Sequence, residues 1–178
     1  MKKTKIKSYA KLNLALNITG KTSSLHKIET IVVFVSLHDQ IIIERAKSQK
    51  HNILFTGKFS QNIGKNNTVL KLLKVLDQKN LLKNEKFRIK INKLIPNKAG
   101  LGGGSMNAAS ILNYFVKKKI IKTSKKELVT ISKLVGSDVI LGLNVANSIL
   151  NEKNEVKNFT NCKQFYVLIV KPDFGCST

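Results

Sequence analysis

The sequence predicts an α+β fold, because segments with strand periodicity and segments with helix periodicity occur along one chain. Residues 5–20 alternate in hydrophobicity with a period of two, and residues 28–37 and 41–45 are rich in β-branched side chains. Residues 66–79 and the segment after Ser105 instead carry apolar side chains at the i, i+3, i+4 spacing of helices. The length of 178 residues fits one domain with its own core.

The strand expected over residues 5–20 presents two different faces. Lys11 and Asn13 are two residues apart, so both project from the same side of the strand. The opposite face, which we expect to be the buried one, consists of Ala10, Leu12, Leu14 and Leu16.

Local signals predict the remaining elements. Asn67 is a suitable N-cap for the helix over residues 66–79. Ser124 and Glu127 form a capping box that opens a helix running to about Leu134. Alternation and apolar runs predict further strands over residues 51–56, over 86–95 up to Pro96, and over 165–170.

The chain is strongly basic, with 32 Lys and Arg against 10 Asp and Glu and a formal net charge of +22. Such a charge fits a nucleic acid, an anionic membrane surface or an anionic substrate. Arginine, which nucleic-acid binders use for bidentate contacts, occurs only as Arg45 and Arg88. The spread of Lys, Asn and Ile along the whole chain also fits a genome-wide composition bias. With 6% aromatic residues and no Trp, a nucleic-acid-binding module is the weaker alternative.

Targeting and metal signals are weak. No stretch approaches the about 18 consecutive apolar residues of a membrane span, and the basic N-terminus lacks the cleavage pattern of a signal peptide. Cys162 and Cys176 have neither the CxxC spacing nor the neighbouring His of a zinc site. We therefore expect a cytoplasmic protein without a membrane span.

Residues 100–105, Gly-Leu-Gly-Gly-Gly-Ser, are the most informative segment. Glycines leave out the Cβ atoms that keep a ligand from the backbone, so consecutive N–H groups can line an anion-binding hollow. Ser105 stands where the next helix is expected to begin, and a helix N-terminus favours an anion. The P-loop pattern and the acidic residue of a dinucleotide fold are both missing. The segment predicts a phosphate site, with a flexible loop capped by Ser105 as the alternative.

Residues 96–105 resemble the P-x3-G-L-G-[SG]-[SG]-S signature of the GHMP small-molecule kinases. Matching segments occur in the same order at residues 10–14 (Ala-Lys-Leu-Asn-Leu), at His26 and at residues 136–139 (Gly-Ser-Asp-Val). The set is similar to the family branch that uses ATP to phosphorylate the 2-hydroxyl of CDP-methylerythritol in non-mevalonate isoprenoid biosynthesis. The resemblance implies a GHMP kinase N-terminal lobe, related to the second domain of ribosomal protein S5.

The resemblance also implies a role for each matching residue. Asp138 would accept the hydroxyl proton, and Lys11 would stabilise the transferring phosphoryl oxygens. Asn13 and His26 would bind the erythritol and cytosine ends of the substrate. Ser105 would help to hold Mg²⁺, and ATP would be bound by Asn67, Lys93, Pro96, Lys98, Gly100, Leu101, Gly102, Gly103, Gly104 and Ser105. Taken alone, Asn67 equally fits a helix cap, and Lys93 equally fits a solvated strand lysine.

The chain departs from the family pattern at several points. Leu25 stands where the family usually has Tyr, Met106 replaces a small hydroxyl residue, and no proline follows Asp138. The chain also stops where the family's C-terminal lobe begins. We therefore expect residues 1–170 to form the ATP-binding domain and 171–178 to begin a lobe absent from this chain. A non-catalytic kinase fragment is an alternative to the active kinase.

Overall fold

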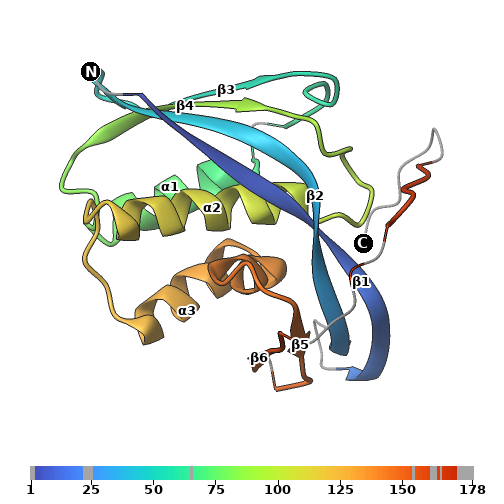
Figure 1. Cartoon of the computed structure of the whole chain (residues 1–178). Helices are drawn as coiled ribbons and strands as arrows, with labels where there is room; N and C mark the ends of the chain where they lie inside the picture. Colours follow the sequence, from blue (N-terminus) through green and yellow to red (C-terminus); the bar gives the residue numbers. More distant parts are fainter. Residues whose placement is uncertain are drawn as a thin grey trace.

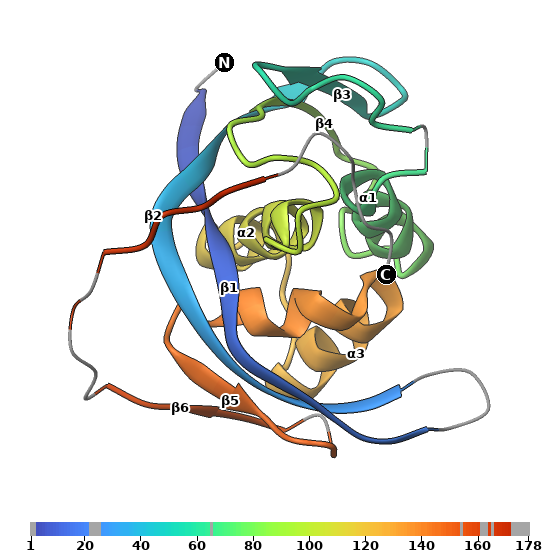
Figure 2. The same cartoon turned by 90° about the vertical axis from the view of Figure 1, so that its right-hand side faces the viewer.

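A twisted sheet covered by helices on one side forms the body of the molecule (Figures 1 and 2). The computed structural model describes residues 3–21, 26–64, 66–153, 155–160, 164 and 166–171. Its elements are β1 Thr4–Lys21, β2 His26–Ala46, β3 Asn52–Thr56, α1 Thr68–Gln78, β4 Lys86–Asn92, α2 Gly103–Lys117, α3 Lys125–Val135, a 3-10 helix Ser137–Leu143, β5 Ser148–Leu150 and β6 Val156–Asn158. The strand order is β3-β4-β2-β5-β6, and β1 pairs with β2. Within the described residues, β3 and β4 pair in parallel and the other strand pairs are antiparallel.

The long strand β2 joins the two segments that the sequence predicts separately. Its C-terminal half pairs with β4 from Gln40 to Ala46, and its N-terminal half pairs with β5 from Thr30 to Val32. The polar stretch between the two expected strands is therefore not a turn. Asp39 in this stretch is completely buried and is used as an internal hydrogen-bond acceptor.

The prediction of which β1 side chains are buried is partly wrong. Leu14 and Leu16 are 51% and 49% exposed, whereas Lys11 is only 4% exposed. The pairing of β1 with β2 shifts register between Tyr9 and Lys11 and again between Asn13 and Ala15. A register shift changes which face a side chain takes, so the simple alternation of residues 5–20 does not extend along the whole strand.

The helices form largely as predicted. The side chain of Asn67 accepts a hydrogen bond from Leu70 N, and that of Ser124 accepts one from Glu127 N, so both predicted N-caps are confirmed. α2 begins at Gly103, two residues before the expected start. Its predicted apolar face of Ala108, Ile111, Leu112 and Phe115 is completely buried against the sheet and α1.

One predicted strand is too long, and another is not found in the described residues. β4 ends at Asn92, not at residue 95, because the N–H groups of Leu94 and Ile95 turn away to donate to the Asp39 carboxylate. Residues 166–170 form no strand, and the side chains of Leu168 and Val170 are exposed. Residue 165 of that prediction lies outside the described residues. Among the described helices, none is both long and apolar enough to cross a membrane.

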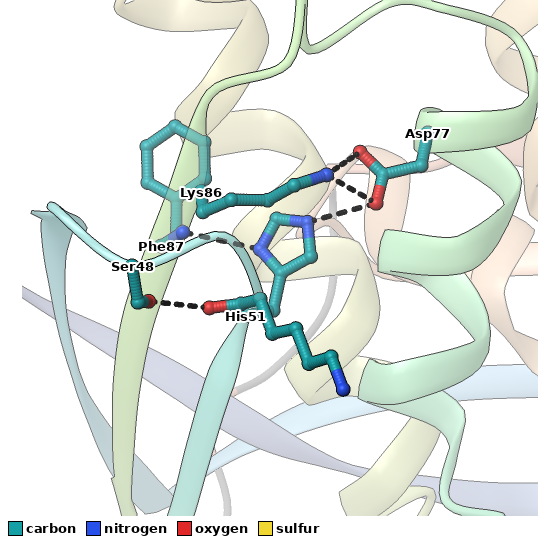
Figure 3. A network of polar contacts seen from close by, with 6 residues as sticks. Ser48, His51, Asp77, Lys86 and Phe87 are labelled. Carbon is teal, nitrogen blue, oxygen red and sulfur yellow. Dashed lines mark hydrogen bonds and ion pairs between the residues drawn. The ribbon is translucent and has the colours of Figure 1, made fainter.

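A polar network ties α1 to β4 at the edge of the core (Figure 3). His51 Nδ1 accepts the N–H of Phe87 at 3.1 Å, so the Nε2 atom carries the proton and donates to Asp77 Oδ2 at 3.2 Å. Lys86 Nζ lies 2.9 Å from both Asp77 oxygens. Burial lowers the pKa of His51 below its ordinary value of 6.5; the Lys86 charge lowers it further, and Asp77 opposes the shift.

This network predicts that the chain loses stability in mild acid. A lowered His51 pKa means that His51 binds a proton more tightly in the unfolded chain than in the folded chain. The contribution of neutral His51 to the free energy of unfolding is therefore complete above pH 6.5, and it declines as the pH falls toward the pKa of the folded chain. We expect the thermal unfolding midpoint to fall between pH 7 and pH 5, and His51→Gln to flatten this dependence. A midpoint that rises over the same interval would contradict the assignment.

Candidate functional site

An open cleft of about 780 Å³ lies between the glycine turn, β1 and the 3-10 helix. In Figure 1 the N-terminal end of α2, which follows the glycine turn, points toward the long strands β1 and β2. The cleft brings together most of the predicted site residues, namely Lys11, Asn13, Pro96, Lys98, Gly100, Leu101, Gly102, Gly103, Gly104, Ser105 and Asp138. Residues more than a hundred positions apart in the chain thus share one surface.

A charged pair stands on the wall of this cleft. Lys11 Nζ lies 3.3 Å from Asp138 Oδ2 and donates a hydrogen bond to Asn13 Oδ1 at 2.9 Å. The Lys11 side chain is almost completely buried, whereas that of Asp138 is 32% exposed. The ammonium is therefore held in place by two oxygens, and the carboxylate remains accessible to a ligand in the cleft.

The glycine turn determines where the Lys11 side chain lies. Lys11 N donates to Leu101 O at 3.1 Å, which joins β1 to the turn. Gly102 has a φ of +67°, and a Cβ built on it would lie 2.8 Å from Lys11 Cγ. Both the backbone conformation and the close approach require glycine at this position. The turn and the charged pair are therefore one structural unit.

The N-terminus of α2 faces the cleft without a cap from the protein. Gly102 occupies the N-cap position, no side chain caps the helix, and its first turn has no acidic residue. The first N–H groups of a helix have no partner within the helix, and they attract anions. The hydroxyl-bearing residues Thr68 and Ser105 line the same cleft. Thr68 Oγ1 packs closely on Gly104, where an added Cβ would lie 3.0 Å from it. This end of the cleft is suited to a phosphate chain.

Three of the predicted residues are not shown to face the cleft. Asn67 caps α1 and does not line the cleft. Lys93 is 2% exposed and forms an ion pair with Asp39, so its interpretation as a solvated strand lysine is wrong, and it does not line the cleft either. His26 begins β2, but its side chain lies outside the described residues.

The structure adds site features that sequence reasoning missed. Asp39, an acid in the short polar stretch between two apolar segments, holds the segment that leads into the glycine turn. Its position in an otherwise β-rich run was the available signal. The cleft also has apolar lining residues, Leu16, Ile18, Ile28, Leu141 and Leu150, together with Thr30. The register shift after Asn13 turns Leu16 and Ile18 toward the same cleft as Lys11 and Asn13.

Comparisons with known proteins show which proteins this chain resembles. Residues 67–152 match the GHMP kinases N terminal domain. The whole chain is 55% identical to the 4-diphosphocytidyl-2-C-methyl-D-erythritol kinase of Pelagibacter ubique (strain HTCC1062) and covers 63% of it. It is 32% identical to the kinase of the same name from Thermoanaerobacter pseudethanolicus and covers 61% of that protein. The chain therefore spans somewhat less than two thirds of the length of these curated relatives.

Solved structures confirm the fold. A crystal structure of 4-(cytidine 5'-diphospho)-2C-methyl-D-erythritol kinase matches 88% of this chain and 55% of that chain, with a TM-score of 0.68 and 24% identity. The mevalonate kinase of Methanococcus jannaschii matches 90% of this chain and 56% of its own, with a TM-score of 0.58 and 16% identity. The predicted α+β fold of a GHMP kinase N-terminal lobe is thus confirmed.

Proposed function

We propose that this chain, which contains the N-terminal domain of a GHMP kinase, serves the ATP-dependent phosphorylation of 4-diphosphocytidyl-2-C-methyl-D-erythritol at its 2-hydroxyl. One observation carries the proposal: the Lys11–Asp138 pair and the uncapped N-terminus of α2 line the same cleft. The names of the relatives supply the substrate. The reaction belongs to the cytoplasm, where ATP is available.

In the proposed step, the substrate hydroxyl attacks the γ-phosphorus of ATP. The new bond joins the hydroxyl oxygen to phosphorus, the bond to the β-phosphate oxygen breaks, and ADP leaves. Asp138, whose carboxylate is accessible in the cleft, accepts the hydroxyl proton. Lys11, fixed between Asp138 and Asn13, stabilises the oxygens of the phosphoryl group in transfer.

The glycine turn would hold the triphosphate. Backbone N–H groups at the start of α2 bind the phosphate oxygens, and Lys98, which lines the cleft, adds a positive charge. The other predicted ATP-binding residues of the turn are Pro96, Gly100, Leu101, Gly102, Gly103, Gly104 and Ser105. Asn67 stays a predicted neighbour of the adenine, whereas Lys93, which is buried and does not line the cleft, is assigned no contact with the adenine.

A magnesium ion would fit the oxygen donors at this end of the cleft. Mg²⁺ prefers oxygen ligands and is commonly held by one or two carboxylates together with substrate phosphates. Ser105 supplies a hydroxyl and Asp138 a carboxylate on the same cleft. The ion would neutralise phosphate charge, and we assign Ser105 as its ligand from this chain.

The substrate would occupy the remainder of the cleft. Asn13 uses its Oδ1 atom to fix Lys11, which directs its Nδ2 atom to the erythritol hydroxyls. His26 is assigned to the cytosine, as the family resemblance implies. The proposed ATP-binding domain comprises residues 1–170; of the predicted start of a second lobe, residues 172–178 lie outside the described residues.

The test measures substrate-dependent ATP turnover in a chimaera. The chimaera consists of this chain followed by the part of the Pelagibacter ubique kinase that the chain does not cover. We expect the chimaera, given ATP, Mg²⁺ and 4-diphosphocytidyl-2-C-methyl-D-erythritol, to release ADP and to form a phosphomonoester visible by ³¹P NMR. The matched control replaces the substrate by cytidine diphosphate. Release of ADP at the same rate in both reactions, or in neither, would contradict the proposal.

A further inference from the structure

A buried lysine lies directly beneath the glycine turn. Lys93 is 2% exposed and does not line the cleft, whereas Gly102, Gly103 and Gly104 do. A Cβ built on Gly103 would point at Lys93 and lie 3.1 Å from its Nζ atom. The backbone at the start of α2 therefore lies between this ammonium group and the cleft.

One buried carboxylate holds the lysine and the segments around it. Asp39, which is completely buried, forms an ion pair with Lys93 Nζ. It also accepts the N–H groups of Leu94 at 2.7 Å and Ile95 at 2.8 Å, and Asn107 Nδ2 at 3.0 Å. Asp39, on β2, therefore holds both the segment that enters the glycine turn and the helix α2. The positive end of the ion pair is the end that meets Gly103.

We infer that Lys93, held by Asp39, is a positioning residue for the phosphate chain of the nucleotide, acting from behind the glycine turn without touching the ligand. This inference rests on the proposed function. The pair fixes the backbone that presents its N–H groups to the cleft. It also places a cation close to the site where an anion would bind, in a protein interior that screens charge weakly.

The alternative is that the pair only stabilises the fold. The two roles differ in which ligands they affect. A buried cation beneath the turn strengthens the binding of a polyanion and leaves an uncharged nucleoside unaffected, whereas a purely structural pair affects neither ligand once the chain is folded. Inorganic tripolyphosphate and adenosine are therefore suitable probes.

The main variant removes both charges together. Each single substitution would leave a buried charge without its partner, which commonly destabilises the fold. Removing both charges of the pair is tolerated better. In Asp39→Asn with Lys93→Met, the Oδ1 atom at position 39 can still accept the N–H groups of Leu94 and Ile95. The matched control is Asp77→Asn with Lys86→Met, a pair that joins α1 to β4 and does not line the cleft.

We expect the Asp39/Lys93 double variant to bind tripolyphosphate and ATP about tenfold more weakly, as a loss of about 1.4 kcal/mol requires. Adenosine affinity should stay unchanged, and the Asp77/Lys86 control should bind all three ligands as the unsubstituted chain does. Titration calorimetry on the 178-residue chain measures these affinities, and circular dichroism verifies folding. Unchanged tripolyphosphate affinity in a folded Asp39/Lys93 variant would overturn the inference.

A second variant keeps the test decisive if the double variant fails to fold. Gly103→Ala retains both charges, and its added Cβ, which points away from the cleft, would lie 3.1 Å from Lys93 Nζ and crowd the ammonium. We expect weaker tripolyphosphate binding here too, and unchanged binding would overturn the inference. If the unsubstituted chain binds neither ATP nor tripolyphosphate, the proposed function itself is contradicted.

Discussion

Asp138→Asn is expected to abolish turnover in the chimaeric enzyme while leaving the fold intact. The amide has nearly the same shape as the carboxylate but cannot accept the hydroxyl proton. Loss of a general base costs about 10²- to 10⁴-fold in rate. Asp138 is 32% exposed, and its only ion pair in the described chain is with Lys11, which also donates to Asn13. The buried Lys11 ammonium keeps its hydrogen bond to Asn13, and the amide oxygen introduced at position 138 can still accept from it, so we expect the fold to be retained.

Three measurements separate a chemical defect from a structural one. The kcat at saturating substrates should fall to the background of the assay, while the thermal unfolding midpoint and the dissociation constant for ATP should stay near those of the unsubstituted enzyme. Glu44→Gln is the matched control, because Glu44 also pairs with cations, Lys3 and Arg88, but lies outside the cleft. Retained turnover in Asp138→Asn would refute the assignment of Asp138 as the base.

The parts of the fold that could be predicted depend on short-range signals. The caps at Asn67 and Ser124 act on amides three residues away, and the buried face of α2 follows from spacings of three and four residues. Such signals are complete within a window of a few residues. The exposed Leu14 and Leu16 show the limit, because the face they take depends on register shifts against β2 that the alternation of β1 does not encode.

In the candidate site, too, the features that depend on neighbouring residues could be predicted, and those that depend on distant residues could not. The glycine turn could be singled out as a candidate phosphate site because its amides, its lack of side chains and the following helix are consecutive in sequence. The ion pair behind the turn could not be predicted, because Asp39 and Lys93 are 54 positions apart and nothing in the sequence indicates that they pair. Only the pairing of β2 with β4 brings the two residues together.

Gly102→Ala and Gly100→Ala should have different effects on turnover, although both place alanine in the same strained backbone conformation. The φ angles are +67° at Gly102 and +70° at Gly100. A non-glycine residue in this left-handed region costs about 1–2 kcal/mol. We therefore expect each substitution to lower the free energy of unfolding by about 1–2 kcal/mol. Urea denaturation measures both losses.

The two positions differ in what the new methyl group meets. Apart from its two chain neighbours, a Cβ at Gly100 meets no atom of the described residues within 4 Å, whereas one at Gly102 lies 2.8 Å from Lys11 Cγ and 3.0 Å from Lys11 Cε. These carbons run along the buried stem of Lys11, so the stem must move and carry its ammonium away from Asp138 and Asn13. A displaced ammonium no longer stabilises the transferring phosphoryl group.

We expect kcat in the chimaeric enzyme to fall at least about tenfold in Gly102→Ala, equivalent to 1.4 kcal/mol of lost transition-state stabilisation. Gly100→Ala should stay within a factor of about three, since it adds strain without crowding Lys11. Equal losses of kcat in the two variants would mean that backbone strain alone accounts for the effect. In that case the close packing of Gly102 on Lys11 would not be what positions the cation for phosphoryl transfer.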